Sequence, residues 1–187
     1  MAEQAPSPNE QRLLDNVTKR VRLWKDVEPF YKDADRGPYK SVESRGTESV
    51  LNALILSSGD AQSGQLSNDT QMAFQIMWDE QQTAGEQKGA WLWLRFKNEP
   101  WEDDSDYFGA TLAAVAIGIA PGNYRATPEV QTNIRLLCGY LNRNLPRRPL
   151  LIVSFSWGPP RSCRDCWNRI GRRPSYATRR RHGPAYA

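Results

Sequence analysis

At 187 residues the chain has room for one domain with a core, or for a piece of a larger domain. Hydrophobic residues make up 39% and charged residues 25%, and no apolar run approaches the roughly 18 residues of a membrane span. Residues 1–145 hold 15 Lys and Arg against 20 Asp and Glu, whereas residues 146–187 hold 10 Arg against one acid, so the two parts carry −5 and +9. The acidic first part is a poor candidate for nucleic-acid binding.

The first residues are polar, so the sequence shows no signal peptide and a cytoplasmic location is the default expectation. The first predicted helix begins with Ser7 as N-cap and Glu10 at the third helical position, a pattern typical of a capping box. Pro29 is expected to close this helix, and a loop is expected over residues 29–45. A second helix is predicted over residues 47–58, followed by a turn rich in Gly and Ser. The expected apolar face of the first helix consists of Leu14, Val17, Val21 and Trp24.

A third helix is predicted to open at Ser67, and an aromatic connection follows from residue 89 to residue 101. The fourth helix, over about residues 106–119, is almost entirely small or apolar. Pro121 and the following glycine should end it, and Thr127 is expected to cap a fifth helix. The residues expected to be buried by the third and fifth helices are Phe74, Met77, Trp78, Val130, Ile134, Leu137 and Leu141.

The helices repeat with a period of 60 residues and without a gap. The expectation is that a short apolar helix of each pair forms an inner layer and an amphipathic helix an outer layer. Two such pairs cannot close a core alone, so further repeats or a partner are expected to cover the open flank. The alternative is a generic helical bundle whose register matches by chance. The matched pairs are Ser67 with Thr127, Phe74 with Ile134, Ile76 with Leu136, Met77 with Leu137, Val50 with Ala110, Ala53 with Ala113 and Ile55 with Val115.

A glutamine-tryptophan pattern occurs between the third and fourth predicted helices, formed by Gln81, Gln82, Gly89 and Trp91. It resembles the QW motif of terpenoid cyclases, in which a glutamine at the end of an outer helix precedes Gly-x-Trp. A glutamine amide can bond free backbone groups at a helix end, and a tryptophan can stack on that amide. Over residues 10–145 the chain resembles squalene–hopene-cyclase-like proteins of the prenyltransferase and terpenoid-cyclase superfamily. The resemblance implies an all-α fold of helix-pair repeats, here an incomplete α/α-toroid.

In that family an Asp-x-Asp-Asp motif protonates a polyprenyl substrate, and aromatic faces stabilise the carbocation. The candidates in this sequence are Asp103, Asp104 and Asp106, whose order differs from the family motif. Carboxylates also gather at a helix N-terminus, so a capping cluster is the alternative interpretation. A diphosphate site would need paired acidic motifs, and only one cluster occurs, so neither metal nor cofactor is expected.

Aromatic side chains around this region are candidates to line an apolar substrate cavity. Such residues are more often part of a core, which is the alternative here. The candidates are Trp78, Trp91, Trp93, Trp101, Tyr107 and Phe108.

Residues 146–187 are rich in Arg and Pro and lose helical periodicity, so they are expected to be unstructured, as are residues 1–9. Cys163, Cys166 and His182 are too few for a zinc site, and the arginine runs fit a solvated tail as well as a phosphate-binding one. A third hypothesis is that this stretch is a translation in a shifted reading frame, because an inserted nucleotide after the codon of Leu151 allows a sequence resembling the next inner helix.

The sequence therefore supports competing functions. The first is a squalene–hopene-cyclase-like repeat domain, an isomerase acting on a polyprenyl substrate if it is catalytic. The alternative is a non-catalytic helical-repeat module that binds a lipid or a protein on its inner face. Nucleic-acid binding through the arginine-rich tail is a distant third.

Overall fold

The computed structural model describes residues 6–32, 39–96, 102 and 104–144. In these ranges the chain is all-α, as predicted, with five α-helices, two short 3₁₀ helices and no strand. None of the described helices combines the length and apolarity needed to cross a bilayer. The predictions made for Trp101, Asp103 and residues 145–187 lie outside the described residues.

Helix α1, Pro8–Arg22, begins at the predicted capping box. The Ser7 hydroxyl accepts a hydrogen bond from the Glu10 amide at 3.3 Å, and the Glu10 carboxylate accepts one from the Ser7 amide at 2.7 Å. The prediction that Pro29 closes this helix is wrong, because the helix ends at Arg22. The Arg45 guanidinium explains the early end, since it donates to the carbonyl oxygens of Trp24 and Val27 beyond the helix.

Helix α2, Tyr39–Ser63, is 25 residues long, so the predicted loop over residues 29–45 and the short helix over residues 47–58 are both wrong. Gly46 and Gly59 both lie inside α2 rather than ending it. Gly46 is buried where the backbone of Leu92 crosses the helix, which gives this glycine a packing role. Helix propensity alone disfavours glycine, and the tertiary contact overrides it.

The remaining helices are α3, Asn68–Asp79, α4, Ser105–Ile119, and α5, Gln131–Arg143, with the 3₁₀ helices Tyr124–Ala126 and Pro128–Val130 before α5. Ser67 caps α3 as predicted, because its hydroxyl accepts from the Thr70 amide at 3.2 Å. Thr127 does not cap α5. Its side chain donates instead to the Tyr124 carbonyl at 2.8 Å, and the short helix Pro128–Val130 intervenes.

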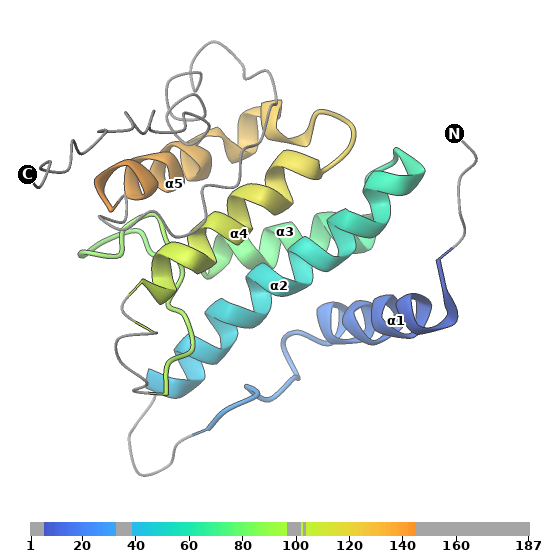
Figure 1. Cartoon of the computed structure of the whole chain (residues 1–187), viewed down its shortest axis with the longest axis horizontal. Helices are drawn as coiled ribbons and strands as arrows, with labels where there is room; N and C mark the ends of the chain where they lie inside the picture. The colour runs from blue at the N-terminus through green and yellow to red at the C-terminus, as the bar shows by residue number, and fades with distance from the viewer. Residues whose placement is uncertain (1–5, 33–38, 97–101, 103, 145–187) are drawn as a thin grey trace, which may run out of the picture. The chain divides into compact units, whose positions relative to one another are not determined.

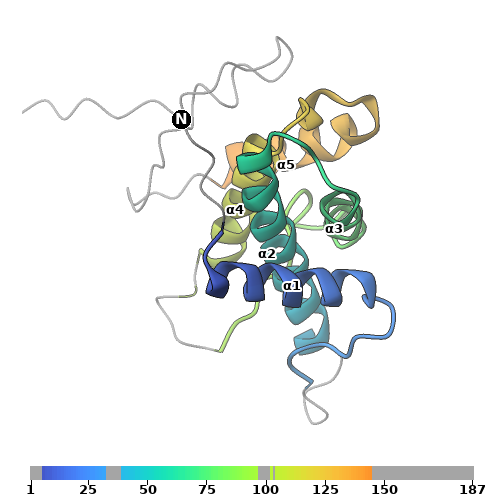
Figure 2. The ribbon, with the colours of Figure 1, turned by 90° about the vertical axis from the view of Figure 1, so that its right-hand side faces the viewer.

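Helices α2 and α4 lie side by side, with α3 against α2 and α5 against α4 (Figure 1). Helix α1 crosses α2 (Figure 2). Two of the matched pairs, Val50 with Ala110 and Ala53 with Ala113, are fully buried at both positions, whereas Ile76 is buried and its match Leu136 is only partly buried. The expected short inner helix is wrong for α2, which is longer than its partner α3.

Candidate functional site

The side chain of Gln81 joins three parts of the chain at the carboxyl end of α3. It is only 4% exposed. Its amide nitrogen donates to the carbonyl oxygens of Gly89, at 3.1 Å, and Asn133, at 3.2 Å. Its amide oxygen accepts from the Asn133 side chain at 3.0 Å. A buried amide satisfied in this way holds the end of α3, the following loop and α5 together.

Trp91 also contacts the carboxyl end of α3. Its side chain is fully buried, and the indole nitrogen donates to the Met77 carbonyl at 2.6 Å, one of the carbonyls near the end of α3. Its ring lies 5.8 Å from that of Trp78. The backbone of Gln82 exchanges hydrogen bonds with Ala90 and Gly89, at 2.9 and 2.7 Å, while its side chain bonds only locally. Of the two glutamines in the predicted motif, Gln81 makes the long-range contacts.

Two of the three acidic candidates, Asp104 and Asp106, lie among the described residues. Asp104 is exposed at the N-cap position of α4 and Asp106 lies in its first turn, as the alternative of carboxylates at a helix N-terminus predicts, although the Asp104 side chain makes no capping hydrogen bond. Asp106 is 5% exposed, accepts from the Trp93 amide at 3.0 Å and pairs with the Arg95 guanidinium. Burial raises the pKa of Asp106 above the ordinary value for aspartate.

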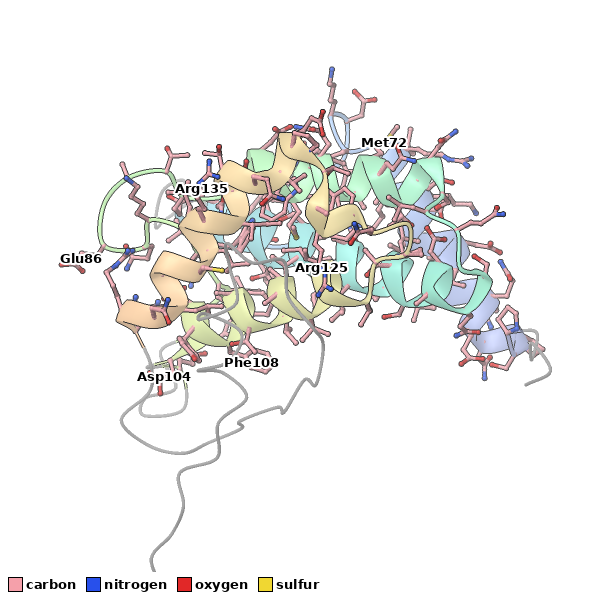
Figure 3. The ribbon with its side chains drawn as sticks, turned by 90° about the horizontal axis from the view of Figure 1, so that it is seen from above. Met72, Glu86, Asp104, Phe108, Arg125 and Arg135 are labelled. Carbon is pink, nitrogen blue, oxygen red and sulfur yellow. The ribbon has the colours of Figure 1, made fainter. Side chains whose placement is uncertain are left out.

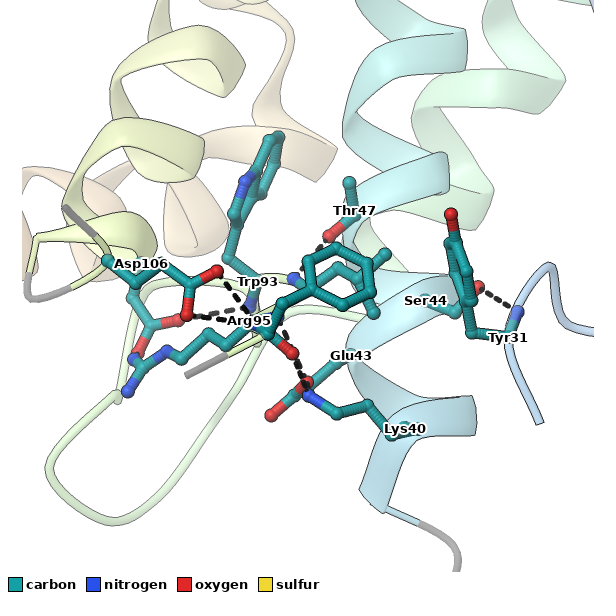
Figure 4. A network of polar contacts seen from close by, with 11 residues as sticks. Tyr31, Lys40, Glu43, Ser44, Thr47, Trp93, Arg95 and Asp106 are labelled. Carbon is teal, nitrogen blue, oxygen red and sulfur yellow. Dashed lines mark hydrogen bonds and ion pairs between the residues drawn. The ribbon is translucent and has the colours of Figure 1, made fainter. Parts of the chain in front are cut away.

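Asp106 belongs to a polar network that fixes the connection between α3 and α4 (Figure 4). Glu43 on α2 accepts from the Arg95 amide at 3.2 Å and pairs with Lys40 at 2.5 Å. The Thr47 hydroxyl accepts from the Leu94 amide at 2.7 Å. The sequence did not single out these residues of α2, because they were assigned to a loop or to its edge.

The described aromatic candidates lie in different surroundings. Trp91 belongs to the core at the end of α3, whereas the Trp93 ring lies edge-on to Phe108, 5.9 Å away, on α4. Phe108 is half-exposed and Tyr107 partly exposed. The core interpretation therefore fits Trp91, and Trp101 lies outside the described residues.

An open cleft of about 830 Å³ lies between α1 and the carboxyl half of α2. We call it the apolar cleft, since five aliphatic side chains line it, one of which, Leu13, is 49% exposed. Glu10, Asp60 and Asp69 also line it, with no lysine or arginine among its described lining residues. Its aliphatic residues are Leu13, Leu14, Leu54, Ile55 and Leu56.

A second, smaller pocket of about 280 Å³ lies where the loop after α3 meets α4 and the end of α5. We call it the polar pocket, because every residue that lines it carries a hydrogen-bonding or charged group. These residues are Glu86, Gln87, Arg95, Asp104, Asp106, Tyr107, Tyr140 and Asn144. Within the described ranges no three His, Cys, Asp or Glu side chains gather closely enough to hold a metal ion.

Comparison of the chain with protein-family models, curated proteins and solved structures gives no match. The function is therefore proposed from the geometry of the apolar cleft and the polar pocket and from the residues around them.

Proposed function

We propose that this chain is a non-catalytic helical-repeat module that binds an uncharged apolar chain, of the polyprenyl or lipid class, in the apolar cleft. The observation that carries the proposal is the open cleft itself, which five aliphatic side chains line, among them the exposed Leu13. Its volume of about 830 Å³ falls in the range of roughly 300–1,000 Å³ common for small-molecule sites. Exposed apolar area of this kind gains free energy when a ligand covers it.

The charges around the cleft favour an uncharged ligand over an anionic one. Asp60 accepts from the Ser67 amide at 2.6 Å, and Asp69 pairs with Arg22 at 2.8 Å, so both carboxylates are fixed by the fold. Arg22 largely balances the charge of Asp69, but an anionic head group would still meet Glu10 and Asp60 without a lysine or arginine in the described lining. A hydrocarbon without a charged head group meets no such penalty.

The contacts of Asp106 favour binding over cyclisation; Asp103 of the same cluster lies outside the described residues. The protonating acid of a cyclase has to reach the substrate, whereas Asp106 is buried in a pair with Arg95. Neither Asp104 nor Asp106 lines the apolar cleft.

The relationship to squalene–hopene-cyclase-like proteins is proposed as the origin of the architecture rather than as an activity. The contacts of Gln81 and Trp91 support it, because they connect α3 to the following loop and to α5 through a glutamine and a tryptophan. The shared burial of positions 60 residues apart supports the repeat in the same way.

The test measures binding of Nile red, a neutral apolar dye, to the full chain and its displacement by squalene. We expect saturable binding, displacement by squalene and no cyclised product on analysis of the mixture. Leu13→Gln should weaken binding roughly tenfold, because about 1.4 kcal/mol of apolar contact corresponds to that factor. Leu23→Gln is the matched control, since Leu23 is 55% exposed and lies outside the cleft.

Equal weakening by both leucine variants would contradict the proposed site, because it would indicate nonspecific adsorption. A cyclised product that disappears in Asp104→Asn would contradict the proposal that the module is non-catalytic and would favour the cyclase hypothesis.

A further inference from the structure

Helix α1 is attached to the rest of the fold by few buried side chains. Of its 15 residues only Val17 and Val21 are buried, whereas α3, with 12 residues, buries six. Helix α1 lies at the edge of the bundle, against α2 and α3 and away from α5 (Figure 3). Because buried apolar area is the main favourable contribution to packing, detachment of a helix that buries so little costs little free energy.

The ion pairs that attach α1 lie near the surface. Arg20 donates to Glu48 of α2 at 2.8 Å, and Arg22 pairs with Asp69 of α3 at 2.8 Å. The side chains of the two arginines are 37% and 63% exposed, so water and salt screen both pairs. Exposed pairs of this kind orient a helix but add little to its attachment.

A buried amide without a partner lies under α1. Asn52 of α2 is 5% exposed, and its side-chain nitrogen is the one buried side-chain nitrogen or oxygen among the described residues that has no hydrogen-bond partner. Glu48 and Gly59 lie on the same face of α2 as Asn52, within an arc of about 40°. They contact Arg20 and Leu14 of α1, so α1 covers the stretch of α2 that contains Asn52.

Docking of α1 removes the Asn52 amide from water without giving its nitrogen a new partner. A buried polar group left unsatisfied in this way weakens the docked state by a factor of roughly 5 to 150. The nitrogen is hydrated again when α1 leaves. Asn52 therefore adds to the small buried surface of α1 as a reason for its detachment.

Helix α1 also forms one wall of the apolar cleft. Leu13, Leu14 and Thr18 line the cleft from α1, and Leu54 and Ile55 line it from α2. A ligand that contacts both walls binds only while α1 is docked, so it stabilises the docked state by mass action.

We propose that α1 is a movable wall of the apolar cleft, which detaches from α2 and α3 as one unit and is held in place by a bound ligand. Detachment of α1 opens the cleft and releases the ligand, while the packing of α2 on α3 and α4 is retained. The holding of α1 by the ligand rests on the proposed function, whereas its detachment in the free chain does not.

The experiment measures hydrogen exchange of the full chain, free and with Nile red, and compares protection factors between helices. In the free chain the amides of α1 should be at least tenfold less protected than those of α4. Low concentrations of urea should change the exchange of α1 little, because a local opening exposes little surface. Nile red at ten times its dissociation constant should slow the exchange of α1 about tenfold.

Asn52→Leu tests the contribution of the unpaired amide, since leucine has nearly the same branching and no polar atom. The protection of α1 should rise at least fivefold, because docking then leaves no unsatisfied group. Asn16→Leu is the matched control, since it makes the same change at an exposed position of α1. Helix propensity alone should raise the protection there by no more than about threefold.

Arg20→Gln tests the same detachment in the opposite direction and does not depend on how leucine fits at position 52. Loss of the pair with Glu48 should lower the protection of α1 by about two- to fivefold. Arg12→Gln is its control, because Arg12 is exposed on the same helix.

Protection of α1 equal to that of α4 would overturn the proposal, and so would an Asn52→Leu variant no better protected at α1 than Asn16→Leu. Saturable binding of Nile red without slower exchange of α1 would overturn the holding by ligand and leave the proposed function intact. Failure of Nile red to bind would instead refute the proposed function, and the exchange of the free chain would still decide whether α1 detaches.

Discussion

Gly46 is the position at which the packing of α2 can be tested most directly. A Cβ added at Gly46 would lie within 3.0 Å of the Leu92 carbonyl oxygen and 3.3 Å from the Leu92 nitrogen. Both neighbours are backbone atoms, so they cannot move away as a flexible side chain could. Gly46→Ala therefore has to displace the segment of the α3–α4 connection that crosses α2.

The expected cost follows from the contacts that hold this segment. Overpacking of this kind costs about 1–3 kcal/mol, and each disturbed hydrogen bond roughly 0.5–1.5 kcal/mol more. Thr47 to the Leu94 amide and Glu43 to the Arg95 amide are the bonds at risk. Alanine returns about 0.8–1.0 kcal/mol through its better helix propensity. The free energy of unfolding should fall by about 1–3 kcal/mol.

Gly59→Ala in the same helix is the matched control. A Cβ at Gly59 would lie 3.2 Å from a terminal methyl carbon of Leu14, which a small rotation of that side chain relieves. This variant should be about 0.5–1 kcal/mol more stable than the natural chain. Urea unfolding of both variants, followed by circular dichroism, gives the comparison. A Gly46→Ala variant as stable as Gly59→Ala would refute the close crossing of the connection over α2.

Three further predictions concern buried polar groups. Gln81→Ala should lower the free energy of unfolding by about 1–3 kcal/mol more than Gln82→Ala, since only the first leaves buried backbone carbonyls without their donor; urea unfolding of the two variants tests this. Trp91→Phe should lower the free energy of unfolding by about 1–3 kcal/mol, because the buried Met77 carbonyl loses its indole donor, and urea unfolding measures the loss. Since burial raises the pKa of Asp106, the folded state binds more protons there than the unfolded state, and its contribution to stability should decline as pH rises from about 4. The free energy of unfolding, measured as a function of pH, should fall less steeply above about pH 4 in Asp106→Asn than in the natural chain, because the variant lacks this carboxyl group.

The starts of α1 and α3 and much of the core were predictable because their signals are local. The capping bonds of Ser7 and Ser67 depend on residues three positions away, and the burial of Phe74 and Leu137 follows helical periodicity. The extent of α2 was not predictable in this way. Glycine normally weakens a helix, and only the contact with the distant Leu92 backbone explains its place there.

Among the candidate site residues, too, those with a local sequence signal could be predicted and those that act through distant contacts could not. Gln81 and Trp91 could be found from sequence because their types and spacing resemble a motif, and their contacts agree with a structural role at the helix end. Glu43 carried no such signal, because it accepts from the Arg95 amide 52 positions away. Asp106 was predicted as a candidate proton donor, whereas in the structure it pairs with Arg95. No sequence signal indicated this pair, because Arg95 looked like an ordinary cation in a loop.

The 60-residue period describes the packed faces of the helices but does not extend to the polar contacts between them. Adding 60 to Gln81, Gly89 and Trp91 gives Leu141, Pro149 and Leu151, whose side chains cannot donate a hydrogen bond. The residues 60 positions later therefore cannot repeat the side-chain contacts by which Gln81 and Trp91 join α3 to its neighbours. Repeated burial and the motif are consequently independent arguments for a repeat architecture. A loss of stability on changing Gln81 would establish these contacts without establishing the repeat, and the repeat has to be tested on the matched helix faces themselves.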